Sequence, residues 1–374
     1  MGRDSRAVEQ ELLSLVDIGG KFHALVEFVN KHEELELCFR GNSSANGMIC
    51  IYYNNFIAYR ISGTNDNSEI TVSVDQGRYS EDWQAQYQKI GLDISPKEYK
   101  KENPNFKTKE KKPYIYSYHI QEGSYLKIED KSDKYDLFFW ENTWSVIKKL
   151  LDDYLDENVE IDRYREHCGA EQTGRKKDPK IEKKAQQKLF SYYSDMKKKY
   201  YFYDLEYIQK GDNTKNKNKP DALAIEYVNG VANSLVFVEV KSKKDSIGVE
   251  GDNAGNKKED STLAGHLKGM RDYIVEAKET GLIDNRIHEA AEILRQYKKL
   301  GVRKVDHLLT DEEISKLKKN QKILVYFTDE ADKAYSSDNT VKEEVDNQIK
   351  RINEDVSTDI VVDFMLKSEL DYEN

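Results

Sequence analysis

The sequence is poor in cysteine, in proline and in long apolar segments, and each shortage excludes a class of protein. Its 374 residues include only three cysteines, an odd number without a paired short spacing, which argues against a disulfide framework and a structural zinc site. We therefore expect buried thiols. Five prolines, with 38% hydrophobic and 34% charged residues, are typical of a soluble globular protein and not of a disordered or fibrous one.

No apolar segment approaches the length of a membrane span, and the first residues lack the apolar core of a secretory signal. Arg6 stands where a myristoylation signal requires serine or threonine. We therefore expect a cytoplasmic protein without a membrane partner. The chain is long enough for two or three domains, each with its own hydrophobic core.

The overall charge is negative, but lysines and arginines gather locally. The formal net charge is −10, whereas the phosphate backbone of a nucleic acid attracts basic surfaces. Basic residues nevertheless concentrate at residues 175–188, 215–219 and 241–244. Such clusters are typical of a surface that binds nucleic acid and also of ordinary solvated faces, so the clusters alone leave both interpretations open.

The first half of the chain carries helix patterns at its start and its end, with short strand patterns between them. Apolar residues at helical spacing before residue 30 predict one or two helices, and a further amphipathic helix is predicted over residues 144–155. Asn54-Asn55 suits a two-residue hairpin turn. We expect an α+β domain over residues 1–161 that recognises a substrate, a ligand or a partner. Its predicted antiparallel meander and later strands cover residues 35–40, 48–53, 56–61, 69–74, 114–120 and 125–129.

Periodicity fades between Asp162 and Pro179, where we place a linker. The segments that follow alternate between helical and strand patterns, which predicts an α/β domain over residues 180–374. Capping boxes at Thr310 and Thr340 each predict the start of a helix. The other predicted helices cover residues 181–199, 263–279 and 286–300, and the predicted strands cover residues 201–209, 222–227, 234–241, 322–328 and 358–366.

Two acids and a lysine, Asp221, Glu239 and Lys241, form the strongest chemical signal. Side chains alternate along a strand, so Glu239 and Lys241 share one face, and we expect this pair to be presented to solvent. A turn at Asn229-Gly230 predicts a hairpin that brings the two acids to one end of adjacent strands. The acids can then share one Mg²⁺ ion, and the lysine can orient the attacking water and stabilise negative charge in the transition state.

Pro220-Asp221 followed by Glu239-Val240-Lys241 resembles the signature of the PD-(D/E)xK nucleases, a family that includes type II restriction enzymes and many defence nucleases. The resemblance covers about the second half of the chain and implies a restriction-endonuclease-like fold, with a central mixed sheet flanked by helices. It implies a Mg²⁺-dependent endonuclease, with Mn²⁺ as a substitute, that hydrolyses phosphodiester bonds of DNA or RNA. Asp221, Glu239 and the Val240 carbonyl would then be metal ligands, and Lys241 the catalytic lysine.

Further candidates near this motif each have an ordinary structural alternative. Glu182, on the helix before the first strand, is a provisional fourth catalytic residue or an exposed helix acid, and Gln186 shares its stripe. His266 lies beside the apolar stripe of a later helix, where a structural histidine is the commoner role. The lysines that we expect to contact nucleic acid are Lys183, Lys184, Lys188, Lys219, Lys243 and Lys244.

Other functions remain open beside the nuclease. A nuclease-like fold can be inactive and serve as a nucleic-acid-binding or scaffold module, although the intact acids and lysine argue against it. A ligand bound to the first domain could activate the nuclease, although the meander differs from the alternating fold of known nucleotide sensors. DNA is favoured over RNA as the partner, and a homodimer or a defence-complex partner is also open. Tyrosines on the first strands can stack on bases or pack in the sheet.

Overall fold

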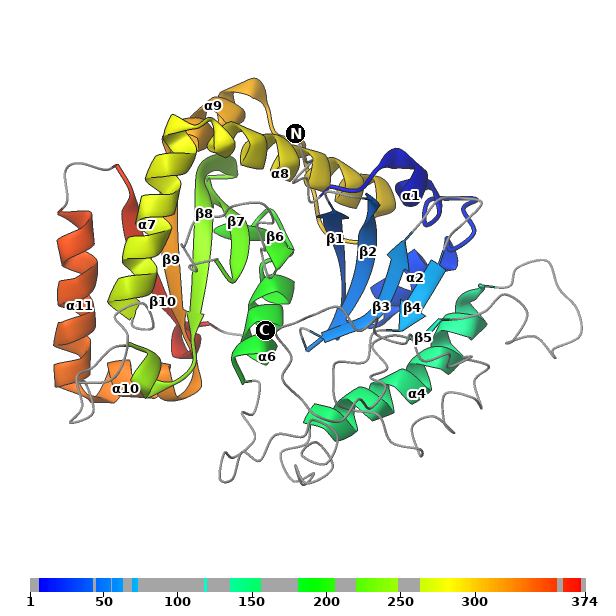
Figure 1. The fold of residues 1–374 in the computed structure, drawn as a ribbon, viewed down its shortest axis with the longest axis horizontal. Helices are drawn as coiled ribbons and strands as arrows, with labels where there is room; N and C mark the ends of the chain where they lie inside the picture. The colour runs from blue at the N-terminus through cyan, green and yellow to red at the C-terminus, as the bar shows by residue number, and fades with distance from the viewer. Residues whose placement is uncertain are drawn as a thin grey trace, which may run out of the picture. The chain divides into compact units, whose positions relative to one another are not determined.

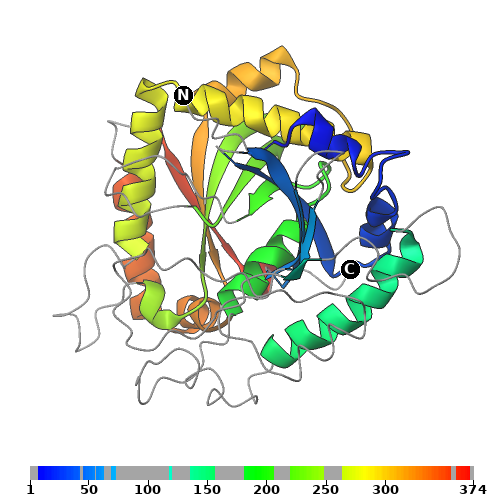
Figure 2. The same ribbon diagram turned by 45° about the vertical axis from the view of Figure 1, so that its right-hand side comes forward.

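The computed structural model describes residues 7–42, 45–54, 56–62, 69–72, 118–119, 135–155, 181–205, 220–247, 263–354 and 359–370. The chain divides into two compact units, a first unit drawn from residues 8–180 and a second unit made mainly of residues 181–374. Each contains a sheet accompanied by helices, as Figure 1 and Figure 2 show. In the part of the chain that is described, no helix is both long and apolar enough to cross a membrane.

The sheet of the first unit is antiparallel and has the strand order β1-β2-β3-β4-β5. The expected meander is therefore confirmed, and Asn54, with φ 50°, begins the predicted turn between β2 and β3. Cys38 and Cys50 lie opposite each other on β1 and β2, and both are buried, as expected. Residues 125–129 and Cys168 lie outside the described residues. The strands are β1 (Leu35–Asn42), β2 (Ala45–Tyr53), β3 (Phe56–Ser62), β4 (Glu69–Val72) and β5 (Tyr118–His119).

Aromatic side chains form the core of the first unit. Trp140 is fully buried, and its ring centroid lies 5.3 Å from that of Tyr59 and 6.1 Å from that of Phe28. Tyr52 and Tyr53 on β2 are also buried, so packing and not base stacking explains these strand tyrosines. The helices of this unit are α1 (Gln10–Ser14), α2 (Ala24–Lys31) and α4 (Leu137–Leu155), and α4 begins earlier than residue 144, the predicted start.

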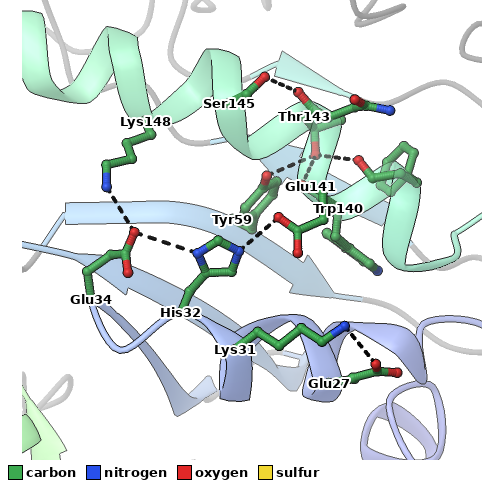
Figure 3. Close-up of polar contacts among 12 residues, drawn as sticks. Glu27, Lys31, His32, Glu34, Tyr59, Trp140, Glu141, Thr143, Ser145 and Lys148 are labelled. Carbon is green, nitrogen blue, oxygen red and sulfur yellow. Dashed lines mark hydrogen bonds and ion pairs between the residues drawn. The ribbon is translucent and has the colours of Figure 1, made fainter.

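Hydrogen bonds and ion pairs connect α4 to the short segment between α2 and β1 that contains His32 and Glu34 (Figure 3). His32 Nε2 lies 2.9 Å from Glu141 Oε2, and His32 Nδ1 lies 3.6 Å from Glu34 Oε1. Lys148 Nζ donates to the same Glu34 oxygen at 2.9 Å. Burial would raise the pKa of Glu34, but the contacts with Lys148 and His32 lower it. Two carboxylates, Glu34 and Glu141, thus link α4 to the end of α2.

The sheet of the second unit is mixed and has the strand order β10-β9-β8-β7-β6. The first three strands form an antiparallel meander, and β9 and β10 are parallel to β8. Asn229 and Gly230, with φ 53° and 77°, form the predicted turn between β7 and β8, because this turn requires left-handed backbone at both positions. The strands are β6 (Tyr200–Leu205), β7 (Ala222–Val228), β8 (Val231–Lys241), β9 (Gln321–Phe327) and β10 (Val361–Leu366).

Helices cover both faces of this mixed sheet. Tyr273 on α7 contacts Phe237 of β8 at 6.0 Å between ring centroids, which places α7 over the face that also carries Glu239. Tyr193, next after α6, stacks on Phe202 at 5.5 Å, and the strand register assigns Phe202 to the opposite face. The helices are α6 (Ile181–Tyr192), α7 (Leu263–Glu279), α8 (Leu282–Leu300), α9 (Asp311–Lys319), α10 (Asp329–Ser337) and α11 (Asn339–Asn353), with short 3-10 turns η1 (Lys244–Ile247) and η4 (Lys367–Glu369).

One of the two predicted capping boxes is present. Thr310 Oγ1 accepts from the Glu313 N–H at 3.2 Å, and Glu313 Oε2 accepts from the Thr310 N–H at 2.9 Å, which confirms the predicted start of α9. The box predicted at Thr340 is wrong. Asp338 is the N-cap of α11, because its carboxylate accepts from the backbone of Thr340 and Val341 and so starts the helix earlier.

Glu313→Gln is expected to destabilise the second unit by about 1–3 kcal/mol at neutral pH, because hydrogen bonds to a charged acceptor are lost. Glu313 is buried, and its Oε1 atom accepts from the Ala232 N–H of β8 at 2.9 Å and lies 3.1 Å from His307 Nε2. Burial would raise the pKa of Glu313, but the backbone donors and His307 lower it below its usual value of 4.5. Urea denaturation measures the free energy of unfolding.

The sign of the pKa shift predicts how this loss depends on pH. A carboxyl group with a lowered pKa in the folded state stabilises the fold above its usual pKa, and this contribution disappears as the pH falls through the folded value. The difference between the wild type and Glu313→Gln should therefore shrink below pH 4.5. Glu312→Gln, with its side chain 78% exposed, is the matched control and should change little. A difference that stays constant down to acidic pH contradicts the prediction.

Candidate functional site

Asp221, Glu239 and Lys241 come together at one end of the mixed sheet. Asp221 directly precedes β7, whose first residue, Ala222, is opposite Val238 of β8, and Glu239 and Lys241 follow Val238 with their side chains on one face of β8. The Asp221 N–H donates to the backbone of β8 at 2.8 Å. Its Oδ2 atom accepts from the Val240 N–H at 2.7 Å. The hairpin therefore brings the two acids to the same end, as the sequence predicts.

Glu239 is the centre of a buried polar cluster. Its Oε1 atom accepts from Lys241 Nζ at 2.5 Å and lies 2.7 Å from His266 Nδ1 on α7. Lys241 Nζ and His266 Nδ1 are 3.4 Å apart, so the three side chains meet at one point. Only 3% of Glu239 and 5% of Lys241 is exposed, so the expectation that this pair is presented to solvent is wrong. The reason is that α7 covers this face of β8.

Burial and charge act in opposite directions on Glu239. Burial raises the pKa of its carboxyl group, but the hydrogen bond with His266 and the charge of Lys241 outweigh that effect, and the pKa lies below its usual value. Glu239 is therefore ionised at neutral pH. A buried carboxylate is costly unless it is paired and hydrogen-bonded, and both conditions are met here.

His266 contacts the candidate residues, although its position beside an apolar stripe favours a structural role. The buried side chains of α7 include Leu263, Leu267, Met270 and Ile274, and His266 lies at the edge of that stripe. Its side chain is 27% exposed and reaches Glu239 on β8. The only feature of the sequence that indicates this contact is a polar residue at the border of a buried helix face. Such a feature is weak evidence for a functional residue.

The residues predicted on α6 are only partly described. Gln186 is buried, Lys184 is half-buried and Lys188 is exposed. Glu182 and Lys183 belong to the first turn of α6, but their side chains lie outside the described residues. The structure therefore leaves the provisional catalytic role of Glu182 as a prediction.

Of the predicted lysines near the β7–β8 hairpin, the structure also describes only some. Lys243 and Lys244 follow the end of β8 after Ser242 and are exposed. Lys244 Nζ donates to Asp338 Oδ2 at 3.0 Å. Lys219 lies outside the described residues. Two of the lysines that are predicted to contact phosphate, Lys243 and Lys244, thus lie at the same end of the sheet as Lys241.

The donor set at this end suits Mg²⁺ better than zinc. Asp221, just before β7, and Glu239 on β8 would provide two carboxylates, and Val240, between Glu239 and Lys241, would add its backbone carbonyl. Within the described parts of the chain, no group of three or more His, Cys, Asp or Glu side chains is arranged to hold a metal ion. Mg²⁺ is commonly held by one or two carboxylates together with several waters, whereas a structural zinc site requires four protein ligands, usually Cys and His.

A cavity of about 550 Å³ lies elsewhere in the second unit. The candidate residues do not line it, and three of its lining residues are Lys278, Lys318 and Lys319. These lysines stand in the last turns of α7 and α9. Cations in a last turn offset the negative end of the helix macrodipole, so the charge of this cavity has a structural explanation.

Comparisons with known proteins give no match: no protein-family model, no curated protein and no solved structure is similar to this chain.

Proposed function

We propose that this protein is a metal-dependent nuclease whose second unit has the restriction-endonuclease-like fold of the PD-(D/E)xK family. The convergence of Asp221, Glu239 and Lys241 at the end of β7 and β8 carries this proposal. The order of α6, the meander β6-β7-β8, the helices α7, α8 and α9 and then the strands β9 and β10 supports it, because the core of that family has a helix, three antiparallel strands, a helix and further strands.

Asp221, Glu239 and the Val240 carbonyl would hold a Mg²⁺ ion, with Mn²⁺ as a substitute. Such an ion, when bound, supplies an activated water and neutralises charge that develops on the phosphate. Glu239 is suited to this role because it is ionised and its carboxylate is fixed by His266. Asp221 is fixed in turn by its hydrogen bond from the Val240 N–H.

Lys241 would orient the attacking water and stabilise negative charge in the transition state. Its ammonium group lies 2.5 Å from Glu239 Oε1, so it is already held beside the carboxylate before substrate binds. A group that is ordered in advance does not have to reorganise during the reaction, which is the main advantage of an enzyme site over water. Burial of the pair strengthens this effect, because electrostatic interactions are stronger away from water.

DNA is the proposed substrate, with RNA as the alternative. Lys188, Lys243 and Lys244 are exposed on the second unit and can contact backbone phosphates. Their role is to hold the strand near Lys241, and they do not read base sequence.

Incubation of the full chain with single- and double-stranded DNA and RNA tests the proposal. Cleavage is expected with Mg²⁺ or Mn²⁺ and should stop when a chelator is added. With Ca²⁺ we expect binding but little cleavage, because the looser coordination of Ca²⁺ positions a water molecule poorly. Gel analysis of the products and a binding assay in Ca²⁺ provide the two measurements. Failure to cleave every substrate with both Mg²⁺ and Mn²⁺ contradicts the nuclease proposal.

A further inference from the structure

The carboxyl ends of three parallel strands lie side by side next to the candidate site. Lys241, Phe327 and Leu366 are in register across β8, β9 and β10. The Thr328 N–H donates to the Lys241 carbonyl at 2.9 Å. Lys367, the first residue after β10, therefore lies two strand spacings, or roughly 10 Å, from the strand of Lys241. Ligands of open α/β sheets commonly bind outside the carboxyl ends of the strands.

Helix α10 contacts both η1 and η4 at this edge, and an aspartate at each of its ends accepts a hydrogen bond from a lysine. Lys367 Nζ donates to Asp329 Oδ1 at 2.8 Å, and Lys244 Nζ donates to Asp338 Oδ2 at 3.0 Å. Asp329 is the first residue of α10 and Asp338 follows its last. The helix has nine residues, so its two ends are roughly 13 Å apart.

Asp329 has a backbone conformation that few residues adopt. Its φ of 52° is left-handed, which is uncommon for any residue other than glycine. Such conformations collect at functional sites, where neighbouring contacts maintain them. Here the Thr328 hydroxyl donates to Asp329 Oδ2 at 2.9 Å, and Lys367 Nζ donates to the other carboxylate oxygen, Oδ1. The carboxylate is thereby fixed beside the lysine.

The backbone that carries Lys367 is also anchored. Asp332 of α10 is buried, and its carboxylate accepts from the Ser368 N–H at 2.7 Å and from the Ser368 hydroxyl at 3.0 Å. The side chain of Lys367 nevertheless remains 41% exposed. An exposed ammonium group on an anchored segment can contact an anion with little loss of conformational entropy on binding.

We propose that Lys367 contacts a backbone phosphate of the nucleic acid, and that Lys367 and Lys244 together position the strand across Lys241. This inference rests on the proposed nuclease function. Phosphates of one strand of a duplex are about 3.4 Å apart along the axis, so the two ends of α10, roughly 13 Å apart, correspond to about four phosphate spacings. Contacts of this kind set the register and orientation of the nucleic acid.

The test measures the affinity of the full chain for a short labelled DNA duplex in Ca²⁺, which separates binding from cleavage. Lys367→Ala is expected to weaken binding and to lower the slope of log K against log salt by about 0.9, the value for one phosphate contact. Lys367→Arg keeps the charge and should restore both. Lys350→Ala is the matched control, because Lys350 is a surface lysine of the same unit that pairs with Glu354 at 3.7 Å.

Asp329→Asn distinguishes a phosphate contact from a structural tether. It removes the ion pair but leaves the charge of Lys367, so the affinity should be retained or increased. If Asp329→Asn and Lys367→Ala lose the same affinity and the same thermal stability, the ion pair only stabilises the fold, and the inference is overturned. Wild-type affinity and slope in Lys367→Ala also overturn it, while cleavage by the wild type leaves the nuclease proposal in place. A wild type that neither binds nor cleaves nucleic acid overturns both.

Discussion

Glu239→Gln is expected to lower the rate of phosphodiester hydrolysis by about 10²–10³-fold or more, the range seen when one charge-stabilising group is removed from an active site. Glutamine keeps the shape of glutamate and can still contact His266 and Lys241. It lacks the negative charge that would bind the metal ion. Initial rates with a labelled duplex in Mg²⁺ provide the measurement, and circular dichroism checks that the variant is folded.

Lys241→Met is expected to reduce the rate to a similar extent, because it keeps the apolar stem and removes the ammonium group. It leaves Glu239 as a buried charge, and removal of one partner from a buried ion pair costs about 3–5 kcal/mol. The double variant Glu239→Gln, Lys241→Met removes both charges. It should therefore be more stable than Lys241→Met alone and still inactive, which separates loss of chemistry from loss of fold.

Glu226→Gln is the matched control for both variants. Glu226 is buried on the other face of the same sheet, where its Oε1 atom accepts from Lys322 Nζ at 2.7 Å. This variant should lose stability but keep the wild-type rate per folded molecule. Folded Glu239→Gln and Lys241→Met proteins that cleave at the wild-type rate would remove these residues from the active site.

The hairpin that brings the acids together is predictable because its signals are local. Asn229-Gly230 suits a turn with left-handed backbone, and the flanking β-branched and aromatic residues favour strands. The capping box at Thr310 is predictable for the same reason, since both of its side chains lie within one turn of α9.

The surroundings of the acids depend on residues far away in the chain. Alternation along β8 assigns Glu239 and Lys241 to one face, but it does not specify what covers that face. The cover is α7, and its His266 is 25 residues beyond Lys241. Strands inside a sheet that has helices on both faces are buried on both sides, so a charged pair in such a strand is buried unless the sheet edge is open.

Helix α10 is absent from the sequence prediction because its apolar signal is weak. Its buried side chains include Ala331, Ala334 and Tyr335 at helical spacing, but alanine and tyrosine contribute little to hydrophobic periodicity. The role of Asp338 as the N-cap of α11 is also missing from the sequence prediction, because the residues from Thr340 onward match the pattern of a capping box. The contacts of α10 with Lys244 and Lys367 therefore could not be predicted from the sequence.

Trp140→Ala is expected to destabilise the first unit by about 3–5 kcal/mol, the usual cost of truncating a buried aromatic side chain. Trp140 is fully buried among Phe28, Tyr59 and Phe139, and its ring centroid is 5.1 Å from that of Phe139. Alanine would leave a cavity that these large rings cannot fill without moving. A loss of this size is a large share of the 5–15 kcal/mol that typically stabilises a domain.

Urea denaturation followed by tryptophan fluorescence measures this loss selectively. The three tryptophans, Trp83, Trp140 and Trp144, all stand in the first half of the chain, so fluorescence reports the unfolding of the first unit. Phe138→Ala is the matched control, because Phe138 is the neighbouring aromatic on α4 and is 59% exposed. It should change the stability by no more than about 0.5 kcal/mol. Equal shifts in the two variants would contradict a core role for Trp140, because an exposed ring loses few contacts when it is truncated.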